Sequence, residues 1–113
     1  MSGITTHVLD TSLGQPASGV PVRLEIRTGN SWRSLARAQT DADGRVRQLL
    51  AEGQALAVST YRLTFDTGSY FRSRESEPFF PEVSVVFAVS DPAQHHHVPL
   101  LLSPFGYSTY RGS

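Results

Sequence analysis

Three consecutive histidines near the end of the chain, His95, His96 and His97, are the side chains best suited to chemistry. An imidazole titrates near neutral pH, so a pair can supply a base and a second group that donates a proton. In an extended strand successive side chains leave opposite faces, which places His95 and His97 on one face and His96 on the other. We therefore expect a candidate site on the face that His95 and His97 share.

Two other segments hold polar side chains that the same alternation turns outward. His7 precedes Val8, so a core position for Val8 makes His7 face away from the core. Arg45 and Arg47 flank Val46 in the same manner. An arginine offers a fixed fork of donors that suits a planar anion, and a guanidinium beside two imidazoles disfavours their protonation. The segments thus favour one outer site that binds an anion and keeps a base available near neutral pH.

The elements that must position these residues are strands, because apolar and polar residues alternate with period two along most of the chain. One short helix is expected within residues 69–76, and a helical turn within residues 52–59 is weakened by Gly53. About eight strands are expected, at residues 4–10, 20–27, 32–39, 45–49, 61–66, 83–90, 95–102 and 107–112. Many short strands with little helix predict an all-β, antiparallel β-sandwich.

Size and composition narrow the class of protein. A length of 113 residues suits a single domain over residues 1–113. Ten basic residues balance ten acidic ones, so charge does not point to nucleic acid or to an anionic membrane surface. Apolar stretches fall short of the roughly 20 residues of a membrane span, and the start of the chain does not resemble a signal peptide. With no cysteine to form a disulfide, these features predict a cytoplasmic protein.

The strand expected at residues 95–102 is apolar on both faces beyond the histidines. Such a pattern indicates that both faces are covered. One cover is the other sheet of the sandwich, so the second would be another subunit. The sequence therefore also predicts an oligomer.

Less specific interpretations of the same residues stay open. A lone His7 on a strand is more often a surface residue, and Arg45 after a turn could be a solvated edge charge. Three histidines could hold zinc, but only His95 and His97 share a face, which leaves the set one or two ligands short unless His7 or a carboxylate joins. No Gly-x-Ser-x-Gly elbow is present, so a serine nucleophile is not expected. Neither a metal nor an organic cofactor is expected.

Several blocks of the chain resemble one enzyme family. Residues 95–104, HHHVPLLLSP, and residues 110–113, YRGS, resemble the C-terminal signature of the 5-hydroxyisourate hydrolases, the transthyretin-related enzymes of urate breakdown. Further similar blocks lie in order along nearly the whole chain, at residues 4–10, 14–17, 40–45 and 79–83. The histidine block and the terminal tetrapeptide are the specific parts, and transthyretin itself lacks them. His96 is a departure, because the family often has tyrosine there.

This resemblance implies a transthyretin-like, or prealbumin-like, sandwich that opens the lactam ring of 5-hydroxyisourate. The residues that correspond to the family's catalytic groups are His7, Arg45 and His97. Substrate binding would involve His7, Arg45, Tyr110, Arg111 and Ser113, with His95 as an auxiliary group. The resemblance also implies a homotetramer, a dimer of dimers with sites in the channel between the dimers. The alternatives are a non-enzymatic transthyretin-like carrier of a small aromatic ligand and a sandwich module with an incidental zinc site.

Overall fold

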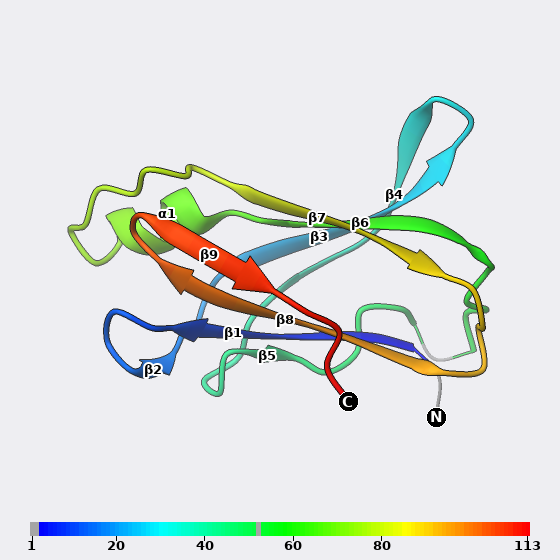
Figure 1. Cartoon of the computed structure of the whole chain (residues 1–113), viewed down its shortest axis with the longest axis horizontal. Helices are drawn as coiled ribbons and strands as arrows, with labels where there is room; N and C mark the ends of the chain where they lie inside the picture. The colour runs from blue at the N-terminus through cyan, green and yellow to red at the C-terminus, as the bar shows by residue number, and fades with distance from the viewer. Residues whose placement is uncertain (1–2, 52) are drawn as a thin grey trace.

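The computed structural model describes residues 3–51 and 53–113, which form two packed β-sheets and one short helix (Figure 1). The first sheet has the order β2-β1-β8-β9, with β5 also paired to β1, and the second has the order β4-β3-β6-β7. The elements are β1 (Gly3–Asp10), β2 (Gln15–Pro16), β3 (Pro21–Thr28), β4 (Ser31–Gln39), β5 (Arg45–Val46), β6 (Ser59–Phe65), α1 (Thr67–Arg72), β7 (Val83–Val89), β8 (His95–Ser103) and β9 (Gly106–Thr109). The all-β sandwich predicted from the period of two is confirmed.

Within this mostly antiparallel sandwich the strands β1 and β8 run parallel, a pairing that the sequence did not predict. The other strand pairs within the described residues are antiparallel. Parallel partners need a long connection between them, and nearly the whole chain separates β1 from β8. Alternation fixes the face of each side chain but not the direction of the partner strand. In the observed register Thr5 lies opposite His97, and His7 lies opposite Pro99.

The predicted faces of β1 and β8 match the observed burial. Alternate residues of both strands are buried against the other sheet: Ile4, Thr6, Val8 and Asp10 in β1, and His96, Val98, Leu100 and Leu102 in β8. The core that they share includes Tyr61, Phe65 and Leu63, each at most 1% exposed. A fully buried side chain of this kind contributes roughly 1.5–3 kcal/mol. The stable inner face therefore fixes the orientation of the residues on the outer face.

The helix α1 begins two residues earlier than the segment predicted from sequence. Asp66 caps it, because its Oδ1 accepts a hydrogen bond of 3.0 Å from the backbone N–H of Ser69. The expected helical turn after residue 52 is absent from residues 53–58, and Glu52 lies outside the described residues. Met1 and Ser2, at the start where no signal peptide was expected, also lie outside them. In the part of the chain that is described, no helix has the length and apolar character needed to cross a membrane.

Candidate active site

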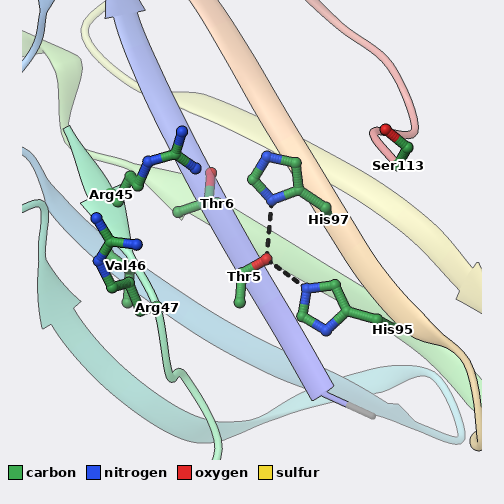
Figure 2. Close-up of a pocket in the computed structure, with 8 residues that line it drawn as sticks. All are labelled: Thr5, Thr6, Arg45, Val46, Arg47, His95, His97 and Ser113. Carbon is green, nitrogen blue, oxygen red and sulfur yellow. Dashed lines mark hydrogen bonds between the residues drawn. The ribbon is translucent and has the colours of Figure 1, made fainter. Parts of the chain in front are cut away.

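A cavity of about 290 Å³ opens on the outer face of the first sheet, where β5, β1 and β8 lie side by side (Figure 2). Its lining comes from all three strands and from the end of the chain: Thr5, Thr6, Arg45, Val46, Arg47, His95, His97 and Ser113. Four residues predicted from the sequence, Arg45, His95, His97 and Ser113, are thus brought to one cavity. In Figure 2 the side chain of Arg45 comes from the β5 side of β1, and that of His97 comes from the β8 side.

A tight turn places Arg45 at this cavity. The carboxylate of Asp41 accepts hydrogen bonds from the backbone N–H groups of Asp43 and Arg45, at 2.8 and 3.0 Å. Gly44 has a φ of 75°, and a Cβ there would collide with the carbonyl oxygen of Val8, so the turn requires glycine. The short strand that follows pairs Arg45 with His7 of β1. The turn that precedes Arg45 is therefore the element that positions the guanidinium.

Arg45 differs from its neighbour Arg47 in how it is engaged. Arg47 lies 3.3 Å from the carboxylate of Asp43 and 3.7 Å from that of Asp41. No residue between 3 and 51 or between 53 and 113 accepts a hydrogen bond from the guanidinium of Arg45. The fork of Arg45 is therefore available to a planar anion in the cavity.

His97 is half-buried, and its ring sits between the cavity and the tail of the chain. Burial, followed by the nearby charges of Arg45, His7 and His95, lowers the pKa of His97 below its ordinary value. The ring is therefore neutral at pH 7 and can take up a proton. A neutral imidazole at the edge of a cavity open to solvent is suited to act as a general base.

The tail holds His97 from the other side. The backbone N–H of Gly112 donates a hydrogen bond of 2.8 Å to the carbonyl of His97. A Cβ at Gly112 would lie 2.5 Å from Cδ2 of His97 and 3.2 Å from Cγ of Pro99. Only glycine lets the tail approach the ring this closely, so Gly112 is a site residue that sequence reasoning did not single out. The predicted strand over residues 107–112 ends earlier, at Thr109, and continues only as this isolated bridge.

Thr5 is the other residue that the sequence analysis missed. Its hydroxyl oxygen lies 2.8 Å from Nε2 of His95 and 2.8 Å from Nδ1 of His97, and Figure 2 shows it between the two rings. Alternation along β1 does place Thr5 on the same face as His7. Only the parallel register, however, puts it opposite His97. The strand pattern thus indicated the face of Thr5, but it did not indicate that β1 pairs with β8, which is what brings Thr5 to the histidines.

His7 lies on the same outer face but is not among the residues that line the cavity. Its Nε2 is 2.9 Å from the carbonyl oxygen of Asp43. Because a carbonyl oxygen can only accept, Nε2 carries the proton, and in the neutral ring Nδ1 is the free acceptor. His7 is nevertheless near enough to His97 to lower the pKa of that residue.

Tyr110 and Arg111 lie outside the cavity in this chain. Tyr110 is 58% exposed. Arg111 donates a hydrogen bond of 3.0 Å to the side-chain oxygen of Gln94. Both border a smaller hollow of about 130 Å³ on the far side of His97, which Val85 and Phe87 also line. The structure therefore brings Ser113 to the cavity, whereas a role of Tyr110 and Arg111 in binding substrate needs a second subunit or a movement of the tail.

Few side chains near the cavity could bind a metal ion. Within the described ranges, no three side chains of the histidine, cysteine or carboxylate type gather closely enough to hold an ion. His95 and His97 each direct one ring nitrogen to Thr5. What the arrangement offers is a neutral imidazole, a second imidazole linked to it through a hydroxyl, and a free guanidinium. These groups suit the attack of an activated water on the carbonyl of a planar, partly anionic substrate.

The chain is similar to proteins of one known family. The model of the HIUase/Transthyretin family matches residues 4–112. The chain is 52% identical to the 5-hydroxyisourate hydrolase of Caulobacter vibrioides, with both proteins covered completely. It is 46% identical to the 5-hydroxyisourate hydrolase of Mus musculus, over 99% of this chain and 96% of that protein.

Two solved structures have the same fold. The structure of Klebsiella pneumoniae 5-hydroxyisourate hydrolase matches with a TM-score of 0.87 at 38% identity, over 99% of this chain and 100% of that one. Sea bream transthyretin in complex with thyroxine matches with a TM-score of 0.89 at 34% identity, over 96% of this chain and 93% of that one. The predicted transthyretin-like sandwich is thereby confirmed.

Proposed function

The chain belongs to the HIUase/Transthyretin family, and we propose for it the reaction for which its relatives are named, the hydrolysis of 5-hydroxyisourate. The product is 2-oxo-4-hydroxy-4-carboxy-5-ureidoimidazoline, in the breakdown of urate. The observation that carries this conclusion is the meeting of His97 and Arg45 at one cavity, in a chain 52% identical over its full length to a hydrolase of that name. The protein is an enzyme that acts on a cyclic amide C–N bond.

The reaction adds water across the lactam bond. The water oxygen attacks the carbonyl carbon, the C–N bond breaks, and the departing ring nitrogen receives a proton. The site must therefore remove a proton from water, stabilise the oxyanion that develops and return a proton. We assign the first step to His97, because its lowered pKa keeps the ring neutral at pH 7.

Arg45 is the group we assign to substrate binding and charge stabilisation. Its guanidinium faces the same cavity as His97 and has no partner among the described residues. A planar, partly anionic heterocycle presents adjacent oxygen and nitrogen atoms that match the guanidinium fork. The same positive charge would stabilise the oxyanion as it forms.

His7 is the second group that we assign to proton transfer. Its Nε2–H is held by the carbonyl of Asp43, which leaves Nδ1 as the exchangeable position. Ser113 lines the cavity, and we propose that it contacts the polar edge of the substrate. Tyr110 and Arg111 are proposed to contact the substrate as well, after a partner subunit covers their segment. His95 supports His97 through Thr5.

A homotetramer formed by two dimers is proposed as the working assembly. On the site-bearing face of the first sheet, Leu101 of β8 is only half-buried and lies opposite the exposed Ser108 of β9, so a second subunit would cover this apolar side chain. Sedimentation equilibrium tests the assembly: a mass near four times 12.4 kDa is expected, and a monomer at assay concentration would contradict it.

Two further expectations from the sequence are carried forward as proposals. Residues 1–113 are proposed to form a single domain, which one cooperative thermal transition would support. The cytoplasm is proposed as the location, because the site needs no disulfide and the chain contains no cysteine.

The activity is tested by following ultraviolet absorbance while urate oxidase generates 5-hydroxyisourate in situ. The substrate also decays without an enzyme, so the observable is acceleration over that background. We expect the chain to accelerate the decay, the acceleration to survive chelation, and His97→Asn to remove it. A folded protein that gives no acceleration but binds small aromatic ligands would instead be the carrier considered from the sequence.

A further inference from the structure

The hydroxyl of Thr5 contacts two imidazoles with a single hydrogen. Its oxygen is 2.8 Å from Nε2 of His95 and 2.8 Å from Nδ1 of His97. A hydroxyl can donate once and accept twice, so at most one of these two nitrogens can be an unprotonated acceptor from Thr5. The other nitrogen must carry a hydrogen and donate it to the hydroxyl oxygen. The protonation of one ring is therefore linked to that of the other.

We propose that Thr5 is a positioning residue that fixes the tautomer of His97 and relays a proton from His97 to His95 during each turnover. The inference rests on the hydrolase function proposed above, for which His97 is the base. In the resting site Nδ1–H of His97 donates to Thr5, and Thr5 donates to Nε2 of His95. Nε2, the other ring nitrogen of His97, is then unprotonated and can take a proton from a water molecule that enters the cavity.

The relay balances as a transfer of one proton through three atoms. When Nε2 of His97 takes a proton from water, the N–H bond at Nδ1 breaks and its hydrogen passes to the oxygen of Thr5. The original hydrogen of Thr5 passes to Nε2 of His95. His97 ends neutral with its hydrogen on Nε2, Thr5 again carries one hydrogen, and His95 becomes the cation. Reversal of the same path returns the proton for the leaving nitrogen.

The surroundings of the two rings give the relay its direction. A positive charge on half-buried His97 is opposed by burial and by the charges of Arg45 and His7. His95 is exposed, so water solvates a charge there. The nearest cation on the tail, Arg111, touches only the backbone carbonyl of His95 at 3.4 Å, is itself exposed and is screened by solvent. Moving the charge to His95 therefore stabilises the state in which water has lost its proton.

A purely structural role for Thr5 makes different demands. It would need only a side chain of the right size to space the two rings. The isosteric variant Thr5→Val keeps that size and removes the hydroxyl, whereas Thr5→Ser keeps the hydroxyl. Thr11→Val is the matched control, because it also removes a hydroxyl that lies between the chain segments of β1 and β8. That hydroxyl donates a hydrogen bond of 3.1 Å to the carbonyl of Leu102, at the end of β1 away from the cavity.

The first measurement is the ring tautomer of His97 by nitrogen-15 NMR on the folded, ligand-free protein. We expect Nδ1–H in the wild type, in Thr5→Ser and in Thr11→Val, and a shift toward Nε2–H in Thr5→Val. Retention of Nδ1–H in Thr5→Val would overturn the control of the tautomer by the hydroxyl. This readout is independent of turnover, so it stays decisive even if the hydrolase function proposed above fails.

The second measurement is turnover at saturating substrate in a double-mutant cycle. Thr5→Val and His95→Gln, whose amide can still bond to Thr5 but cannot take up a proton, should each lower kcat by about 10-fold or more, a part of the ~10²–10⁴ that a positioned base contributes. Groups on one path are not additive, so the double variant should be no slower than the slower single variant. Additive losses, or wild-type kcat in Thr5→Val, would overturn the relay. Absence of turnover in the wild type would instead overturn the proposed function and, with it, the catalytic part of the relay.

Discussion

The contact between Gly112 and His97 gives a prediction whose size follows from the structure. Gly112→Ala would place a Cβ 2.5 Å from Cδ2 of His97, where an ordinary contact begins at 3.4 Å. The ring or the tail must therefore move by about 0.9 Å to restore an ordinary contact, the difference between the two distances. A misplacement of about 1 Å can lower the rate by ~10²-fold. We expect turnover to fall by about that factor, measured in the coupled urate oxidase assay.

Stability should change much less than turnover in this variant. Displacing residue 112 breaks the 2.8 Å hydrogen bond from Gly112 to the carbonyl of His97, a net contribution of about 0.5–1.5 kcal/mol. Alanine offsets about 0.4–1 kcal/mol of this by restricting the unfolded chain. Gly106→Ala is the control, since the nearest atom to its Cβ would be Oγ of Ser103 at 3.9 Å. Equal losses of activity in the two variants, or none in Gly112→Ala, would refute the reasoning.

Four further outcomes are expected. His97→Asn should lower kcat by ~10²–10⁴-fold with an unchanged melting temperature; wild-type turnover would remove the base assignment. Arg45→Lys keeps the charge but loses the fork, so KM should rise with a smaller change in kcat, and an unchanged KM would argue against anion binding. Burial and Arg45 lower the pKa of His97, so the acid limb of kcat/KM should lie below pH 6.5 and move to higher pH in Arg45→Gln. Burial raises the pKa of Asp10, but hydrogen bonds from Ser12 and Tyr70 outweigh it and lower the pKa. The stability from this carboxylate is then present above its unfolded pKa near 3.8 and lost as pH falls, and Tyr70→Phe should make acid unfolding begin at a higher pH.

The alternation of apolar and polar residues was enough to predict which face of its strand each site residue occupies. It placed His96 on the face opposite to that of His95 and His97, and the structure shows that the face of His96 is the buried one. It could not give the parallel pairing of β1 with β8, which depends on contacts across nearly the whole sequence. Thr5 was missed for that reason. Gly112 was missed because its role comes from having no side chain, which lets the tail lie against the ring of His97. A sequence pattern does not show such a contact.

The positive charges of the site predict that substrate itself strengthens the base. In the free enzyme, burial and then the charge of Arg45 keep the pKa of His97 low. A partly anionic substrate bound to Arg45 offsets that charge, and negative charge near an imidazole raises its pKa. The acid limb of kcat, which reports the substrate complex, should therefore lie at higher pH than that of kcat/KM, which reports the free enzyme. Coincident limbs would mean that Arg45 and the substrate do not meet beside His97. In Arg45→Gln both limbs should move to higher pH, because the guanidinium then no longer lowers the pKa of His97.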